Sequence, residues 1–143
     1  MGRVGTTHTP VTADTIRTWC GTADHLVIKP VIDLHDHIHV DAYEVPDRIK
    51  EHLTLRDHTC VFPWCTRPAQ SCDTDHVHPF ESGGETSTDN TAPLCRRHHR
   101  AKAHGRWKLT ALSPGSYLWR TPHGLHLRRD HTGTTLLPTS GHT

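Results

Sequence analysis

Two pairs of metal-ligating residues constrain this chain more than any other feature of its sequence. The first pair is Cys60-x4-Cys65 and the second is Cys95-x2-His98, and twenty-nine residues separate the two pairs. Zinc prefers four tetrahedral sulfur or nitrogen ligands, and ligands that are close in sequence form small chelate loops at little entropic cost. One zinc ion bound to all four residues would therefore hold the start of this region against its end.

A structural ion would contribute to stability because the chain has few residues that can form a hydrophobic core. Apolar residues make up 33% of the 143 residues and aromatic residues 6%. Small chains with thin cores often depend on a disulfide or a metal. The cysteine count of five is odd, and the N-terminus lacks the apolar core of a secretory signal. We therefore expect a cytoplasmic protein with reduced thiols and no membrane-spanning segment.

The cysteines also allow other interpretations. The paired residues would, without an ion, be three small buried hydrophobic side chains and a surface histidine. Cys72 is either a fifth sulfur near the metal or a buried free thiol, and we assign no role to Cys20.

A second constellation lies between and beside the two pairs. Asp75-His76 is followed by Gly83-Gly84, then by Asn90, and finally by His99 directly after His98. Neighbouring residues on a helix point about 100° apart, so His98 can face zinc while His99 faces an adjacent groove. We expect Asp75 and His99 to bind a divalent cation that is suited to phosphodiester cleavage.

Two further residues complete this predicted site. His76 is the expected general base, because an imidazole takes a proton from water near neutral pH. Asn90 is expected to hold the loop and to orient the imidazole, since its amide both donates and accepts hydrogen bonds. Each has an alternative: His78 is a rival base, Asn90 is also suited to capping a helix, and a single histidine is often only a polar surface residue.

Charge is divided unevenly along the chain. Residues 1–90 carry seven Lys/Arg and fourteen Asp/Glu, a net −7, whereas residues 91–143 carry nine Lys/Arg and one acid, Asp130, a net +8. A basic half next to a metal-binding region predicts contact with the phosphates of DNA, with little sequence specificity. The alternative is an ordinary solvated basic helix. The residues expected to contact DNA are Arg96, Arg97, Arg100, Lys102, His104 and Arg106, with Lys108 shortly after them.

The coarse pattern predicts mixed secondary structure. Helices are expected at 11–20, capped by Thr12 or Asp14, at 46–54, and from Pro93 to 103 with an end at Gly105. Strands are expected at 26–34 with an interruption at Pro30, and at 75–80, 107–112, 117–121 and 125–128, with a turn-rich loop at 81–90 and a loose tail after Gly133. We divide the chain into an N-terminal segment 1–54, a catalytic segment 55–108 and C-terminal short strands 109–143.

The motifs together resemble a known family. CVFPWC, CDTDHVHP, ESGGETSTDN and LCRRHHRAKAHGRW stand in the order found in HNH nucleases, and the likeness is greatest to actinobacterial HNH proteins with an upstream helical domain of unknown function. The resemblance implies an α+β fold, the small ββα-metal (HNH) fold stapled by a structural zinc, with short flanking helices and C-terminal strands. Residues 11–59 look like the tail of the upstream region.

The resemblance also assigns roles. It implies that Cys60, Cys65, Cys95 and His98 hold Zn²⁺, that Asp75 and His99 hold Mg²⁺, Mn²⁺ or another divalent cation, that His76 is the general base and that Asn90 orients the loop. The x4 spacing of the first pair, and His98-His99 in place of Cys-His, depart from the commoner pattern.

We therefore predict a metal-dependent DNA endonuclease that nicks or cuts both strands. Cleavage of both strands by a single-site enzyme would favour a homodimer or two successive nicks. The alternatives are a zinc-stabilised nucleic-acid-binding module that does not cut, and a nuclease domain separated from its targeting partner.

Overall fold

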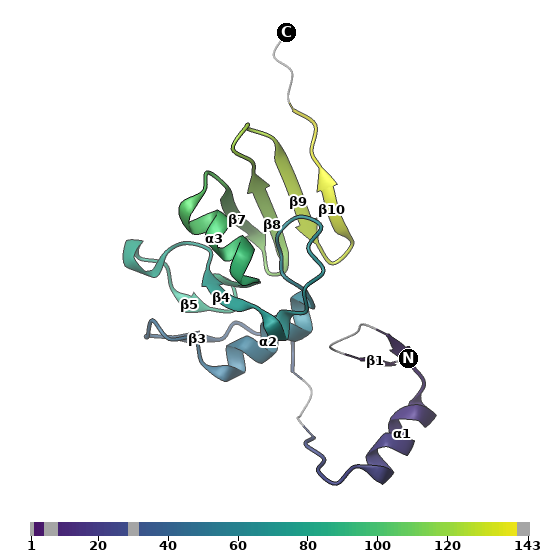
Figure 1. Ribbon diagram of the computed structural model, residues 1–143. Coiled ribbons are helices and arrows are strands. Elements are labelled where there is room, and N and C mark those ends of the chain that lie inside the picture. The colour runs from purple at the N-terminus through teal and green to yellow at the C-terminus, as the bar shows by residue number, and fades with distance from the viewer. Residues whose placement is uncertain (1, 5–8, 29–31, 140–143) are drawn as a thin grey trace. The chain divides into compact units, whose positions relative to one another are not determined.

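The computed structural model describes residues 2–4, 9–28 and 32–139, which divide into two compact units, residues 1–33 and 34–143 (Figure 1). The division of the chain at residues 54 and 108 stays a prediction. No helix in the described ranges is long and apolar enough to cross a membrane.

The first unit holds a short strand pair and one helix. Strand β1 (Gly2–Arg3) pairs antiparallel with β2 (Pro10–Val11), and helix α1 (Ala13–Thr22) follows. The Thr12 hydroxyl accepts a hydrogen bond from the Thr15 backbone N–H at 3.2 Å, which satisfies one of the free donors at the start of the helix. The predicted helix and its Thr12 cap are confirmed.

The strand expected at 26–34 is wrong for the part of it that the structure describes. Residues 26–28 and 32–34 are not in a strand, and Pro30 lies outside the described residues. Val27 and Ile28 are 79% and 82% exposed. An apolar, β-branched run becomes a strand only where a partner strand covers it, which local propensity does not reveal.

The second unit begins with the elements that surround the predicted site. In chain order they are β3 (His39–Val40), α2 (Asp47–Asp57), the 3-10 turn η1 (Ala69–Ser71), β4 (Asp73–His76), the 3-10 turn η2 (Phe80–Ser82), β5 (Thr86–Ser87), β6 (Thr91–Leu94) and α3 (Arg96–His104). Strand β4 pairs antiparallel with β6, and α3 follows β6 directly. Two strands and a helix in this order form the expected mixed α+β core of the site.

Helix α3 begins three residues later than the sequence predicts. Pro93 lies inside β6, paired with Thr74, and its carbonyl accepts the Val61 backbone N–H at 3.0 Å. The helix starts at Arg96, after Cys95, and ends where the Gly105 N–H bonds the Ala101 carbonyl. A proline also suits a strand position that lacks a ladder N–H, so its presence alone did not decide between a helix start and a strand.

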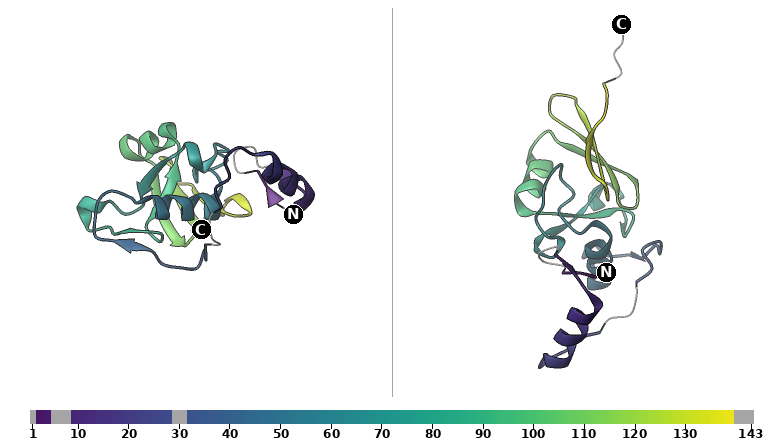
Figure 2. Two further views of the ribbon diagram at one scale, coloured as in Figure 1. Left: turned by 90° about the horizontal axis from the view of Figure 1, so that it is seen from below. Right: turned by 90° about the vertical axis from the view of Figure 1, so that its right-hand side faces the viewer.

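The C-terminal third forms a four-stranded antiparallel sheet. Its strands are β7 (Lys108–Ser113), β8 (Ser116–Arg120), β9 (His126–Asp130) and β10 (Gly133–Leu136), in the spatial order β10-β9-β8-β7. The turns at Gly115 and Gly124 have positive φ, as glycine allows. Figure 1 shows α3 beside β7, and Figure 2 gives the same sheet from two further sides.

Three of these strands confirm the sequence prediction, but β10 occupies the tail that was expected to be loose. The turn before it is held locally, since the Asp130 carboxylate accepts the Thr132 backbone N–H at 2.8 Å. The strand itself reads GTTL, which has no alternation of apolar and polar residues to indicate it.

The core lies between the inner face of this sheet and the elements around the cysteines. Trp119 is completely buried and donates from Nε1 to the Val61 carbonyl at 2.9 Å. Leu109 and Leu127 pack in the same cluster as Cys60 and Leu94. The sheet is therefore part of the compact body that holds the metal-ligand residues.

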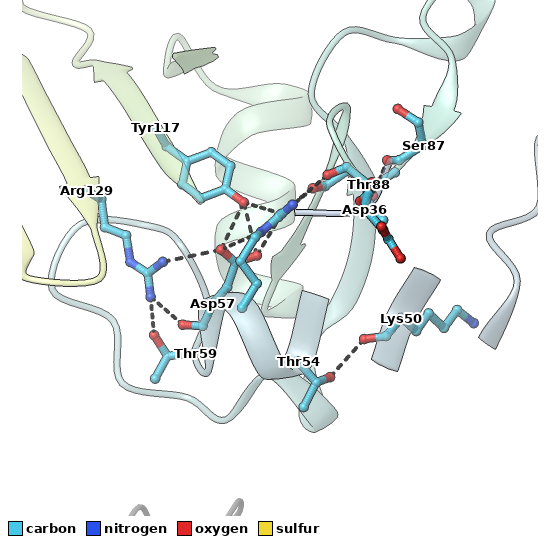
Figure 3. A network of polar contacts seen from close by, with 11 residues as sticks. Asp36, Lys50, Thr54, Asp57, Thr59, Ser87, Thr88, Tyr117 and Arg129 are labelled. Atoms are coloured by element: carbon cyan, nitrogen blue, oxygen red, sulfur yellow. Dashed lines mark hydrogen bonds and ion pairs between the residues drawn. The ribbon is translucent and has the colours of Figure 1, made fainter. Parts of the chain in front are cut away.

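A buried polar network joins α2 to the same sheet (Figure 3). Tyr117 donates to the Asp57 carboxylate at 3.0 Å, and Arg56 donates to both the Asp57 carboxylate and the Tyr117 hydroxyl. Burial and the Asp57 charge raise the pKa of Tyr117, which stays a donor. Arg129 donates to the Asp57 carbonyl and the Thr59 hydroxyl, both at 2.8 Å. The network fixes the end of α2 just before Cys60.

Candidate functional site

The four predicted zinc ligands come together in the folded chain. Their ligand atoms, three Sγ atoms and the Nδ1 of His98, all lie within 4.8 Å of one another. His98 Nδ1 is 3.2 Å from Cys95 Sγ and 3.6 Å from Cys60 Sγ. In a tetrahedral site with zinc–sulfur bonds of about 2.3 Å, the ligands are separated by roughly 3.5–3.8 Å. The set therefore could hold a metal ion, and its soft donors fit zinc.

In the absence of an ion, their surroundings keep Cys60, Cys65 and His98 of this cluster in their neutral forms. Burial raises the pKa of Cys65 to about 11, and a hydrogen bond with Cys72 together with burial raises that of Cys60. Burial lowers the pKa of His98, which keeps its imidazole neutral. A bound zinc ion would deprotonate the thiols that coordinate it, and its positive charge would stabilise the buried thiolates.

Packing around the cluster sets the direction of the histidine. The Phe62 ring stacks on the His98 ring with centroids 3.9 Å apart and planes 8° from parallel. Phe62 also contacts Trp119 of the core. Cys72 lies next to Cys60, as its hydrogen bond indicates, but it is not one of the four residues whose ligand atoms converge. It is a fifth sulfur beside the cluster.

His99 faces away from the cysteines and lies between two carboxylates. Its Nε2 is 3.2 Å from Asp75 Oδ1, and its Nδ1 is 3.1 Å from Asp73 Oδ2. When Nδ1–H donates to Asp73, the lone pair of Nε2 points toward Asp75. Two ligands of one octahedral Mg²⁺ or Mn²⁺ ion lie about 3 Å apart, so Asp75 and His99 fit such an ion.

Asp73 is the residue of this arrangement that sequence reasoning missed. It accepts from Arg96 at 3.0 Å as well as from His99, and it lies at the start of β4. Histidine metal ligands commonly donate their other ring N–H to a carboxylate, which fixes the tautomer. The signal was present in the sequence, because Asp73 and Asp75 alternate on one strand and face the same side.

Lys102, which was expected from the sequence to contact DNA, contacts Asp75 and His76 of the predicted catalytic site. Its Nζ donates to Asp75 Oδ2 at 2.6 Å and to the His76 carbonyl at 2.9 Å. Its side chain is only 14% exposed. This amine therefore neutralises one oxygen of Asp75 and holds α3 against the end of β4.

The His76 ring is oriented by a contact between its Nε2 and the Thr86 hydroxyl. Its Nε2 is 2.8 Å from the Thr86 hydroxyl, and that hydroxyl donates its hydrogen to the Ala42 carbonyl. Thr86 must therefore accept from His76, which places the imidazole hydrogen on Nε2 and leaves Nδ1 with its lone pair. Burial lowers the pKa of His76, so the neutral form dominates at neutral pH.

The segment before α2 also contributes to the surroundings of His76. Tyr43 stacks on the His76 ring with centroids 5.5 Å apart, and β3 pairs with β5, where Thr86 lies. Neither Tyr43 nor Ala42 lies within the motifs, and no local pattern signals their place. Only the tertiary pairing of β3 with β5 brings them to the site.

Asn90 holds the loop after β4 in the way its amide suggested. Its Oδ1 accepts the His78 backbone N–H at 2.9 Å, and its Nδ2 donates to the carbonyls of His78 and Glu85. Strand β4 ends at His76 and does not reach residue 80 as predicted; the Val77 N–H still donates to the Asn90 carbonyl, and at His78 the Asn90 side chain takes over both backbone bonds. A Cβ at Gly84 would lie 1.9 Å from the His78 carbonyl oxygen, which explains a glycine at that position.

A pocket of about 590 Å³ lies beside Asp75 and His76. Its lining also includes Tyr43, Lys102 and Lys108. His78 also lines it, but its Nε2 is held by the Ser82 carbonyl at 3.0 Å. The remaining residues expected to contact DNA are exposed, on or directly after α3. They are Arg96, Arg97, Arg100, His104 and Arg106.

Comparison with known proteins identifies this region. A sequence model of the HNH endonuclease family matches residues 60–105, the range that contains both ligand pairs and the residues from Asp75 to His99. Residues 60–105 belong to the HNH endonuclease family. An HNH domain indicates a nuclease or nucleic-acid-binding function and a divalent metal.

The chain is also similar to proteins that are much longer than it is. The chain is 34% identical over 102 residues to the uncharacterized protein Rv3776 of Mycobacterium tuberculosis, covering 71% of this chain and 19% of the relative. The same identity and length hold for the uncharacterized protein Rv2100 of that organism, covering 71% and 18%. The chain thus spans about a fifth of the length of these relatives. No solved structure matches the chain.

Proposed function

We propose that the chain is a metal-dependent DNA endonuclease that hydrolyses phosphodiester bonds with His76 as general base. The observation that supports this most is the orientation of His76. Thr86 engages Nε2, and none of the described residues forms a hydrogen bond with the basic Nδ1; the ring lines the same pocket as Asp75. A base must be oriented before its basicity is useful.

The proposed chemistry assigns a task to each residue. His76 Nδ1 accepts a proton from water, and the oxygen of that water forms a bond to phosphorus. The bond from phosphorus to the 3′ oxygen breaks, and the 3′ oxygen leaves with the electron pair and takes up a proton from solvent, which gives a 5′-phosphate and a 3′-hydroxyl. Asp75 and His99 would hold Mg²⁺, Mn²⁺ or another divalent cation, which supplies Lewis-acid stabilisation of charge on the phosphate oxygens. Asp73 fixes the His99 tautomer, and Asn90 keeps the loop after His76 in place.

The zinc cluster has a structural task in this proposal. Zn²⁺ on Cys60, Cys65, Cys95 and His98 would fix the start of α3, and with it the position of His99. Cysteine ligands of this kind stay reduced in the cytoplasm, where we place the protein. The chain offers exposed arginines for phosphate contact and no base-reading element that we recognise in the described residues, so we expect low sequence specificity. Cleavage of both strands would require two successive nicks or a homodimer.

One observation favours the alternative of a zinc-stabilised nucleic-acid-binding module. Both Asp75 oxygens have partners, since Oδ1 contacts His99 and Oδ2 contacts Lys102. A cation must compete with these contacts, and a chain that keeps them would bind nucleic acid without cutting it.

The test compares two histidines of the same pocket. An end-labelled DNA duplex is incubated with Mg²⁺ or Mn²⁺ and the zinc-loaded wild type, His76→Ala or His78→Ala. We expect 5′-phosphate products from the wild type and from His78→Ala, and roughly a hundredfold or greater loss with His76→Ala. If His78→Ala alone abolished cleavage, the assignment of the base would be wrong. If neither the wild type nor either variant cleaved the duplex, the alternative of a nucleic-acid-binding module would be favoured.

A further inference from the structure

The outward face of the C-terminal sheet carries a row of basic side chains. Along β7, β8 and β9 the residues alternate, with Leu109, Trp119 and Leu127 buried in the core. Residues one position away from these buried residues on the same strands point to the outward face of the sheet, and four of them are basic. They are Lys108, Arg120, His126 and Arg128.

Strand register sets these side chains next to each other. Lys108 is paired with Arg120 across β7 and β8, and Arg120 is paired with His126 across β8 and β9. Arg128 lies two residues further along β9, opposite Leu118. Neighbouring strands are about 4.8 Å apart, so the row of three spans roughly 10 Å. Lys108 and Arg120 are like charges directly opposite each other, an arrangement that a bound polyanion would stabilise.

Little within the protein neutralises this face. The chain has no Asp or Glu between residues 91 and 129, so Asp130 is the single acid on the three strands, and it lies 3.6 Å from Arg128. In the described part of the chain neither Lys108 nor Arg120 forms an ion pair. The Lys108 and Arg120 charges are therefore available to a ligand.

The row begins at the catalytic pocket. Lys108 lines that pocket together with Asp75 and His76, and β7 is the edge strand of the sheet on the side of α3. A backbone bound in the pocket would thus continue over β8 and β9. Each strand of B-DNA carries one phosphate for about every 3.4 Å of helix axis, and the strand winds round that axis, so a straight row of roughly 10 Å can face about two of them.

From this geometry we propose that Lys108, Arg120, His126 and Arg128 form a binding surface for the sugar–phosphate backbone of duplex DNA beside the cleavage pocket. The proposal rests on the proposed function, because it takes its ligand from the chemistry of the adjacent site. It adds a contact surface that lies outside the HNH-matched residues 60–105. It also gives the C-terminal sheet a role in binding besides its part in the core.

The test measures binding without cleavage. A fluorescent 30-base-pair duplex is titrated with the zinc-loaded His76→Ala chain, without added divalent cation, at several salt concentrations. The same background then carries Arg120→Gln with Arg128→Gln. The matched control is Arg48→Gln, which removes a cation from the exposed side of α2, the helix whose Arg56 contacts the inner face of the sheet. Arg120→Lys with Arg128→Lys keeps both charges.

Counterion release predicts the size of the effect. Each lost phosphate contact lowers the slope of log affinity against log salt by about 0.9, which is roughly five- to tenfold in affinity at 0.1 M salt. We expect the double glutamine variant to bind about 25- to 100-fold more weakly with a slope lower by about two. The lysine variant should bind within about threefold of the background, and so should Arg48→Gln.

Three results would overturn the proposal: unchanged affinity and slope in the double glutamine variant, an equal loss in the Arg48 control, or tighter binding of duplex RNA than of DNA. Failure here is distinct from failure of the proposed function, because cleavage by the wild type with Mg²⁺ is measured separately. A chain that cleaves DNA but binds equally well without Arg120 and Arg128 retains the function and loses this surface.

Discussion

The Thr86 hydroxyl is expected to control the reactivity of His76, although no role for Thr86 was predicted from the sequence. Thr86 is completely buried, and its single hydroxyl accepts from His76 Nε2 and donates to the Ala42 carbonyl. Thr86→Val keeps the shape of the side chain and removes both bonds. A buried hydrogen bond contributes about 1 kcal/mol net, so the variant should lose about 1–3 kcal/mol of unfolding free energy.

The effect on the reaction should be separate from this loss of stability. Without Thr86 the imidazole can rotate and exchange its tautomer, so Nδ1 presents its lone pair for only part of the time. A loss of 1.4 to 2.8 kcal/mol in orientation corresponds to about a ten- to hundredfold fall in kcat. Thr86→Ser keeps the hydroxyl and should restore most of the rate.

The chain offers a matched control for this prediction. Thr88 is also buried, and its hydroxyl accepts from the Ile38 N–H at 3.1 Å, but it does not contact His76. Thr88→Val should lower stability by a similar amount and leave kcat within about threefold. The assay is steady-state plasmid nicking at saturating plasmid, which gives kcat, with urea unfolding for stability. Equal losses of kcat in both variants, or an unchanged kcat in Thr86→Val, would show that the Thr86 hydroxyl does not orient His76.

Three further predictions concern metals and pH. Asp73→Asn should weaken Mn²⁺ binding by the zinc-loaded chain about 10- to 100-fold in calorimetric titration, because the second carboxylate orients His99, and unchanged binding would contradict that role. Cys65→Ser should lose zinc and unfold at a much lower temperature, whereas Cys72→Ser should keep both zinc content and unfolding temperature; equal zinc loss in the two variants would exclude the assigned ligand set. His52 is fully buried and burial lowers its pKa, so the unfolded state binds its proton first and the wild type loses stability as pH falls below about 6.5. Urea unfolding at pH 7 and 5.5 should therefore show a smaller loss for His52→Leu than for the wild type, and an equal loss would show that His52 does not contribute.

Sequence predicted the metal-ligand cluster because its residues form close pairs. The spacing of Cys60 with Cys65, and of Cys95 with His98, constrains geometry locally, and the four ligand atoms do converge. The different directions of His98 and His99, about 100° apart, followed from helix geometry alone. Such features depend on a few neighbouring residues, which is why they could be predicted.

Contacts between distant segments could not be predicted in this way. Ala42 and Tyr43 reach His76 only because β3 pairs with β5, and those two strands have two residues each. The start of α3 was misplaced because Pro93 suits a helix start and a strand position equally well by local rules. Strand β10 has no apolar alternation, and it forms through pairing with β9.

The Asp57 network shows the same dependence on tertiary structure. Tyr117 and Arg129 come from the C-terminal sheet and meet Asp57 at the end of α2, sixty or more positions earlier in the chain. Segments 47–57 and 108–136 thus pack together around the HNH-matched residues. Local patterns indicated each element but not this association.

Metal-dependent DNA cleavage with His76 as base is tested most directly on supercoiled plasmid. The zinc-loaded chain with Mg²⁺ or Mn²⁺ is compared with the same chain without added divalent cation and with His76→Ala. We expect relaxed or linear plasmid only when the wild type and a divalent cation are present together. A folded, zinc-loaded wild type that leaves the plasmid supercoiled with every divalent cation, or a His76→Ala chain that cleaves as fast as the wild type, would contradict this expectation.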